Sequence, residues 1–105
     1  NISDLIGKTS ITDVLDIIKL SSCVVSNDSG LMHVAAALDK PVVGIYGSSS
    51  PVYTPPLLND EKKITHYEEL SCSPCFKKTC PLGHMNCLNN ITIDNVKNSI
   101  LQLVK

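Results

Sequence analysis

Apolar residues are spaced in two different ways along this chain, one typical of helices and one typical of buried strands. The stretch 11–20 repeats apolar residues at helical spacing behind the capping pair Thr9-Ser10, which predicts a first helix from about Ile11 to Leu20. Apolar residues at 93, 96, 100, 103 and 104, with Thr92 as a cap, predict an amphipathic closing helix from Ile93 to Val104.

Two short runs, Cys23–Ser26 and Val42–Tyr46, are apolar without polar alternation, as expected for strands covered on both faces. Between them the stretch 30–38 favours a helix, which Asp39-Lys40-Pro41 stops. Strand, helix and strand in this order predict an α/β fold with a parallel sheet and a right-handed crossover. Prolines from Pro51 onwards indicate an irregular loop, and Lys62–His66 is a candidate edge strand.

A polar loop follows each of the two strands, at Asn27–Gly30 and at Gly47–Ser50. Parallel strands end at the same edge of a sheet, and ligands of open parallel sheets bind at that edge. We therefore expect these loops to be neighbours. Their serines and glycines suit phosphates and sugar hydroxyls.

The six residues Asp28-Ser29-Gly30-Leu31-Met32-His33 join the first strand to the following helix. A helix start presents backbone N–H groups and partial positive charge, and Gly30 lets a ligand approach the backbone closely. Helical side chains lean towards the amino end, so the His33 imidazole should reach the same place. We interpret this as an anion site for the diphosphate of a nucleotide-sugar. The alternative is a plain helix cap by Asp28 or Ser29, with a tight turn at Gly30 and a surface histidine.

The composition limits which other classes of protein the chain can belong to. The 105 residues fit one small domain, and a 43% hydrophobic and 18% charged composition is typical of a globular chain. A net charge of −1 offers no basic stripe for nucleic acid. No apolar run approaches the length of a membrane span, no signal peptide opens the chain, and Asn1–Leu5 reads as a loop entering a domain already under way.

Four of the five cysteines fall within one short segment, while Cys23 lies in an apolar run typical of a core. The spacing Cys72-x2-Cys75-x4-Cys80-x6-Cys87 supplies four ligands for a structural zinc ion, and His84 is a possible substitute for Cys80 or Cys87. An iron–sulfur cluster and a loop of buried thiols with no ligand remain open. Since no secretory signal is present, we expect a reducing compartment rather than a disulfide framework.

The stretches Val25–Leu38, Tyr46-Gly47, Ser50-Pro51 and Thr54–Leu57, with Pro41, resemble the C-terminal part of the bacterial ADP-heptose:lipopolysaccharide heptosyltransferases. The Asp-Ser-Gly-Leu-Met-His stretch is shared across that family. The Ser-Pro-x-x-Thr-Pro-Pro-Leu stretch points to its heptosyltransferase II branch. Ser48 departs from the pattern, because relatives often have proline there.

The resemblance implies a Rossmann-like parallel sheet in the C-terminal half of a GT-B glycosyltransferase. Residues 1–105 would then be a partial C-terminal nucleotide-sugar-binding domain, with 72–87 as a cysteine-rich insert. It implies that Ser29, Gly30 and the Leu31 backbone contact the donor diphosphate, that His33 lies beside it, and that Asp28 orients the loop or touches the donor sugar. No catalytic residue is expected in this segment, because the family's base belongs to the N-terminal domain.

The same resemblance implies ADP-L-glycero-D-manno-heptose as the donor and the lipopolysaccharide inner core as the acceptor. No metal cofactor is expected for the transfer itself. The full-length enzyme would work in the cytoplasm, in peripheral contact with the inner face of the inner membrane. The rival interpretation is a zinc-stabilised interaction module in which the strand–helix–strand unit is only a scaffold.

Overall fold

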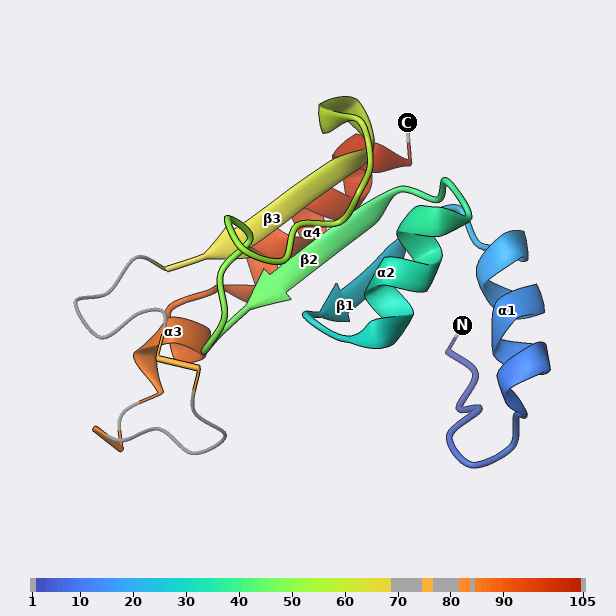
Figure 1. The fold of residues 1–105 in the computed structure, drawn as a ribbon, viewed down its shortest axis with the longest axis horizontal. Coiled ribbons are helices and arrows are strands. Elements are labelled where there is room, and N and C mark those ends of the chain that lie inside the picture. The colour runs from blue at the N-terminus through green and yellow to red at the C-terminus, as the bar shows by residue number, and fades with distance from the viewer. Residues whose placement is uncertain (1, 69–74, 77–81, 84, 105) are drawn as a thin grey trace.

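The computed structural model describes residues 2–68, 75–76, 82–83 and 85–104, and within them it contains helices on both sides of a small sheet (Figure 1). In chain order the elements are α1 (Ile11–Leu20), β1 (Val24–Asn27), α2 (Gly30–Ala37), β2 (Val42–Tyr46), the 3-10 turn η1 (Asp60–Lys62), β3 (Lys63–Tyr67), α3 (Asn86–Asn89) and α4 (Ile93–Leu103).

The sheet has three parallel strands in the order β1-β2-β3. Val24 pairs with Val42 across the first ladder, and Gly44 pairs with Thr65 across the second. The predicted α/β class and the parallel strand–helix–strand unit are confirmed. The candidate edge strand is also present, one residue later than predicted. All three strands end at one edge of the sheet, which we call the carboxyl edge.

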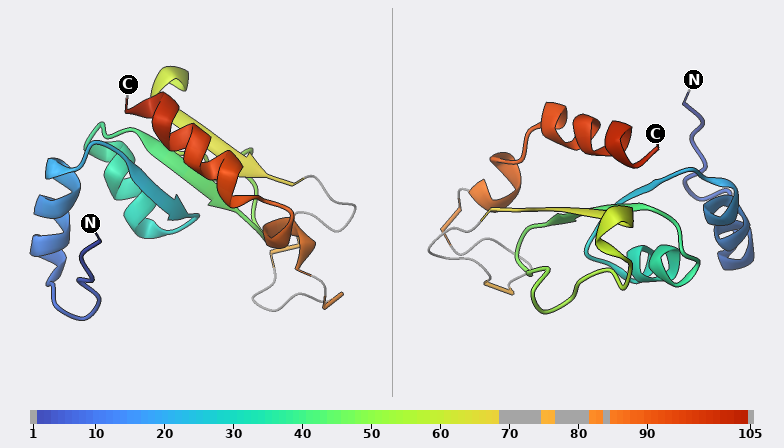
Figure 2. Two further views of the ribbon diagram at one scale, coloured as in Figure 1. Left: turned by 180° about the vertical axis from the view of Figure 1, so that it is seen from behind. Right: turned by 90° about the horizontal axis from the view of Figure 1, so that it is seen from above.

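Helices cover the two faces of the sheet unequally. Helix α2 lies on one face and α4 on the other, while α1 lies beside α2 beyond the β1 edge (Figure 2). The central strand β2 is the best covered, since Val42, Val43 and Tyr46 are fully buried. On β1, Val25 stays 43% exposed because α4 packs over β2 and β3 rather than over β1. The prediction of a doubly covered strand therefore holds for β2 and is wrong for β1, where buried residues are absent.

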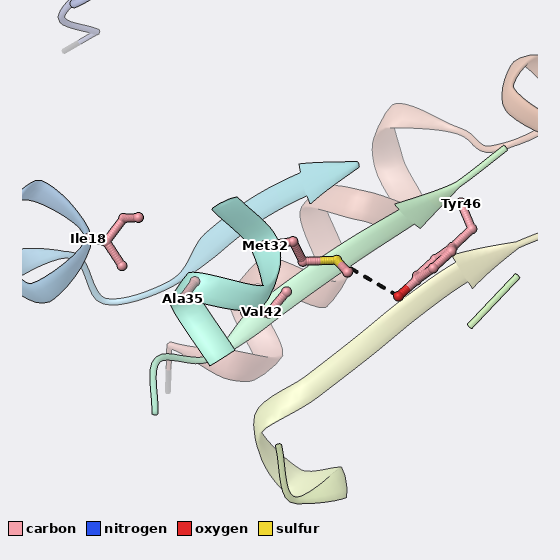
Figure 3. Close-up of a cluster of buried hydrophobic side chains, with 5 residues drawn as sticks. All are labelled: Ile18, Met32, Ala35, Val42 and Tyr46. Atoms are coloured by element: carbon pink, nitrogen blue, oxygen red, sulfur yellow. Dashed lines mark hydrogen bonds between the residues drawn. The ribbon is translucent and has the colours of Figure 1, made fainter. Parts of the chain in front are cut away.

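The core joins α1, α2 and β2 through the cluster drawn in Figure 3, which consists of Ile18, Met32, Ala35, Val42 and Tyr46. The Tyr46 hydroxyl lies 3.8 Å from the Met32 sulfur. A Cβ atom at Gly44 would approach the Tyr46 ring to 3.1 Å and the Met32 sulfur to 3.3 Å. Glycine at this position therefore leaves room for the two large side chains to meet, which seats α2 directly on the central strand.

The helix ends follow the predicted signals. Ser10 and Asp13 form a reciprocal capping box at α1, and the Thr92 hydroxyl accepts a hydrogen bond from the Asn95 N–H at α4. Two short elements, η1 and α3, were not predicted, because one turn of helix has too little periodicity to be recognised. In the described part of the chain, no helix combines the length and apolar character that crossing a membrane requires.

Candidate functional site

The amino end of α2 stands at the carboxyl edge, beside the end of β1. Ser29 is its cap residue with extended backbone (φ −152°, ψ 170°), yet no side chain caps the helix. The Ser29 hydroxyl instead lies 3.3 Å from the hydroxyl of Ser26. The side-chain cap expected in the plain-cap alternative is therefore absent, although Ser29 does occupy the cap position, and the first N–H groups of the helix have no side-chain partner there.

Gly30 begins the helix on an open surface. It is not among the residues with positive φ, and a Cβ atom added to it would meet nothing within 4 Å. Neither backbone conformation nor internal packing therefore requires glycine at this position. The following residue, Leu31, is 47% exposed, so the start of the first turn is accessible from outside, whereas Met32 points into the core.

His33 and Asp28 form a pair across this first turn. The His33 Nε2 lies 3.3 Å from the Asp28 Oδ1, so the imidazole leans back towards the helix start as predicted from helix geometry. The His33 side chain is 41% exposed, whereas the Asp28 side chain is only 17% exposed. The carboxylate is thus the covered member and the imidazole the member that faces outwards.

The loop after β2 supplies further partners for Asp28. The hydroxyls of Ser49 and Thr54 both donate to the Asp28 Oδ2, at 2.7 Å and 2.8 Å. The two polar loops are therefore neighbours, as predicted from the shared edge. The Ser49 loop was expected there, but Thr54 was not identified as a site residue, because it lies 26 residues from Asp28 in an irregular proline-rich stretch.

These contacts set the charge of the carboxylate. Partial burial of Asp28 acts to raise its pKa, but the hydrogen bonds from Ser49, Thr54 and His33, together with the charge of the imidazole, outweigh that effect. The net result is an Asp28 pKa below its ordinary value. Asp28 is therefore ionised at neutral pH and able to hold the His33 ring by a charge-assisted contact.

Tyr46 supports the site from the core. Its side chain is fully buried, and its hydroxyl donates to the Thr54 carbonyl at 2.6 Å. Burial, and secondarily the negative charge of Asp28, raises the pKa of Tyr46 to about 12. The phenol therefore stays protonated and keeps donating throughout the physiological range.

The structure thus brings together all the residues predicted for the anion site. Asp28, Ser29, Gly30, Leu31 and His33 lie within the loop and first turn that start α2. Backbone N–H donors at an uncapped helix start, next to an outward-facing imidazole, are suited to bind an anion. The Asp28 carboxylate at this place accepts hydrogen bonds from Ser49 and Thr54 and contacts the His33 ring.

The cysteine ligands predicted for zinc lie mostly outside the described residues. Cys72, Cys80 and the substitute His84 are among those not described, while Cys75 and Cys87 are partly buried and free of disulfides. In the described ranges no three side chains of the histidine, cysteine, aspartate or glutamate type gather as a metal site. The four-cysteine site stays a prediction, and nothing described supports the zinc-module alternative.

A cavity of about 340 Å³ lies away from the anion site, between α4 and β2. It is lined mainly by aliphatic side chains, among them Ile45, Val96 and Ile100, with Lys97 also contributing. None of the residues predicted for the anion site lines it. An apolar lining of this kind offers few hydrogen-bond donors to a diphosphate, so it does not compete with the carboxyl edge as the anion site.

A parallel α/β sheet with an open helix start at its carboxyl edge is consistent with a Rossmann-like fragment of a glycosyltransferase. The sequence profile of Glycosyltransferase family 9 (heptosyltransferase) matches residues 1–86. The chain belongs to this family, as the sequence resemblance predicted.

Individual relatives agree with this assignment. The chain is 33% identical over 104 residues to lipooligosaccharide heptosyltransferase 2 of Campylobacter jejuni subsp. jejuni serotype O:2, an alignment that covers 99% of this chain and 32% of the relative. It is 52% identical over 54 residues to lipooligosaccharide heptosyltransferase 2 of Haemophilus influenzae, covering 51% of this chain and 16% of the relative. It is 49% identical over 61 residues to lipopolysaccharide heptosyltransferase 2 of Salmonella typhimurium, covering 58% of this chain and 18% of the relative.

The chain spans about a third of the length of the relative that it matches over almost its own full length. No solved structure matches the chain.

Proposed function

We propose that this chain is the donor-binding part of a heptosyltransferase that acts in the synthesis of the lipopolysaccharide core. Its donor is ADP-L-glycero-D-manno-heptose, and residues 1–105 form part of the C-terminal domain of a GT-B enzyme. The observation that carries the proposal is the uncapped amino end of α2 with the Asp28–His33 pair beside it. Membership of the heptosyltransferase family supports it.

Each predicted residue has a role in this proposal. The backbone N–H groups of Ser29, Gly30 and Leu31 bind the diphosphate, and His33 lies beside it as a further donor. Asp28 orients the loop and the imidazole. When the bond between heptose and phosphate breaks, negative charge grows on the departing ADP, and donors fixed in advance stabilise that charge. Fixed dipoles and an imidazole replace a divalent metal, so the transfer needs no metal cofactor.

The acceptor is the inner core of lipopolysaccharide, which the family's N-terminal domain holds together with the base that activates its hydroxyl. The complete enzyme works in the cytoplasm, in peripheral contact with the inner face of the inner membrane. Support for the acceptor comes from the relatives, which are named lipopolysaccharide or lipooligosaccharide heptosyltransferases.

The test is an NMR titration of the 15N-labelled chain with ADP, with adenosine as the matched ligand that lacks phosphate. ADP is expected to shift the amide signals of Gly30, Leu31 and His33, and adenosine is expected to leave them in place. Absence of ADP-induced shifts there at millimolar concentration would contradict the proposal.

A glycine variant sharpens this test. In Gly30→Ala the new methyl group meets no protein atom within 4 Å, so the fold should tolerate it, but it occupies the space through which the diphosphate approaches. We expect ADP affinity to fall by roughly tenfold, as for loss of one charge-assisted hydrogen bond. Gly7→Ala is the control, because Gly7 precedes α1 and is outside the loop and turn that start α2, while its φ of +71° means that alanine there strains the backbone.

A further inference from the structure

The loop after β2, residues 47–54, folds back over the start of α2 and contacts it through Asp28. We call this segment the rim loop. Ser49 lies near its start and Thr54 at its end, and both donate their hydroxyl hydrogens to the same carboxylate oxygen, Asp28 Oδ2. The other oxygen, Oδ1, is left to His33. Each carboxylate oxygen therefore contacts a different segment: Oδ2 contacts the rim loop and Oδ1 contacts helix α2.

We propose that Thr54, together with Ser49, is a positioning residue of the donor site: it fixes the Asp28 carboxylate so that Oδ1 orients the His33 imidazole towards the diphosphate. This inference rests on the proposed function, because it concerns the same site. It goes beyond it by assigning a role to a residue outside the loop and helix that bind the anion.

Thr54 is itself held rigidly, which a positioning residue requires. Its carbonyl accepts the hydrogen bond from the buried Tyr46 hydroxyl at 2.6 Å, and its N–H donates to the Ser50 carbonyl at 3.1 Å. Ser50 is only 2% exposed, so this turn is anchored in the body of the domain. The position of the Thr54 hydroxyl is therefore determined by the core and not by the open edge.

A continuous chain of contacts results, running from the Tyr46 hydroxyl through Thr54 and Asp28 to His33. Two hydroxyl donors on one oxygen stabilise the ionised carboxylate, which is the state that attracts an imidazole. The titratable groups that interact with Asp28 are His33 on α2 and Tyr46 on β2. Loss of the Thr54 hydroxyl would leave Oδ2 with one donor and give the carboxylate freedom to turn.

The test compares Thr54→Val, which keeps the branched shape and removes the hydroxyl, with Thr54→Ser, which keeps the hydroxyl. Two quantities are measured on the 105-residue chain: the Asp28 pKa, from the carboxyl carbon signal, and ADP affinity. Thr54→Val is expected to raise the Asp28 pKa and to weaken ADP binding by roughly three- to tenfold, the effect of one hydrogen bond. Thr54→Ser is expected to restore both. Thr65→Val, an exposed position on β3, is the matched control.

Ser49→Ala provides a second variant if Thr54→Val does not fold, and it too should raise the Asp28 pKa. An Asp28 pKa that is unchanged in every folded hydroxyl-free variant would overturn the positioning role while ADP binding by the parent chain still upheld the proposed function. A raised pKa with unaltered ADP affinity would overturn it as well. If the parent chain fails to bind ADP at all, the proposed function falls, and this inference falls with it.

Discussion

Asp28 carries the most concentrated set of contacts of any acidic residue in the described part of the chain. Three donors from two other segments meet on its two oxygens, and its pKa lies below the ordinary value as a result. A carboxyl group whose pKa is lowered on folding stabilises the fold above the pKa of the unfolded chain. That stabilisation is lost as the pH falls through the pKa of the folded state.

Asp28→Asn therefore has a pH-dependent effect on stability. The amide keeps the size of the side chain but removes the charge, so the free energy of unfolding at neutral pH is expected to drop by about 1 kcal/mol or more. The difference from the parent chain should close under acid conditions, where the parent's Asp28 is protonated too. Urea unfolding across a pH series measures both chains. Asp16→Asn, which removes an exposed carboxylate on α1, is the control. A difference in the free energy of unfolding that stays constant with pH would show that the charge of Asp28 does not contribute to stability.

Local geometry explains which site residues could be predicted from the sequence. His33 was placed correctly, because the spacing of residues on a helix and the lean of their side chains determine where it reaches. The rim loop was expected to be near, since parallel strands share an edge. The role of Thr54 could not be predicted, because its approach depends on the Tyr46 hydroxyl and on a proline-rich turn with no periodicity.

At the level of elements, α3 is one of the two short elements that the sequence did not predict. It is only four residues long, yet its Leu88 packs against the end of β2. A Cβ atom at Gly47 would lie 2.9 Å from both the Leu88 Cγ and its Cδ2, which is closer than real contacts allow. The small size of Gly47 therefore allows the start of the rim loop to pack against Leu88 of α3.

Gly47→Ala is expected to lower the free energy of unfolding by about 1–3 kcal/mol, because the added methyl group overpacks this contact. Thermal or urea unfolding measures the loss. Leu88→Ala in the same chain removes the obstructing atoms, so the double variant should recover part of the stability, and the two changes should be non-additive. Additive effects would mean that Leu88 does not pack on Gly47 in solution.

The elements that the sequence did predict share a strong local signal. The ends of α1 and α4 are marked by Ser10 and Thr92, whose side chains cap the helices as expected. The strands β1 and β2 were predicted within a residue, because continuous apolar runs of that length have few alternatives in a parallel sheet. By contrast, η1 and α3 are each about one turn long, which is too short for a periodic pattern of apolar residues.

The whole molecule is a small part of what its relatives contain. It covers about a third of the Campylobacter jejuni relative, and β1 forms one edge of the described sheet with Val25 partly exposed. Under the proposed function, donor binding and turnover are therefore expected to be separable properties. The described residues contain the proposed anion site, whereas the proposed base and acceptor site belong to another domain.

We accordingly expect the 105-residue chain to bind ADP without transferring heptose. With ADP-heptose and an inner-core acceptor, release of ADP should not exceed that of a reaction without protein. Chromatographic analysis of the nucleotide measures it, and a full-length heptosyltransferase 2 is the positive control. Acceptor-dependent release of ADP by this chain alone would contradict the proposal that the donor site and the catalytic base belong to different domains.

The buried phenol of Tyr46 also gives the molecule a built-in optical reporter. The chain has no tryptophan and three tyrosines, so its near-ultraviolet absorption comes mainly from phenol rings. Burial, and secondarily the negative charge of Asp28, raises the pKa of Tyr46 to about 12, and its hydroxyl donates to the Thr54 carbonyl. The appearance of its phenolate band under strong alkali would therefore signal that the packing around Tyr46, next to the anion site, has opened. No label would have to be attached.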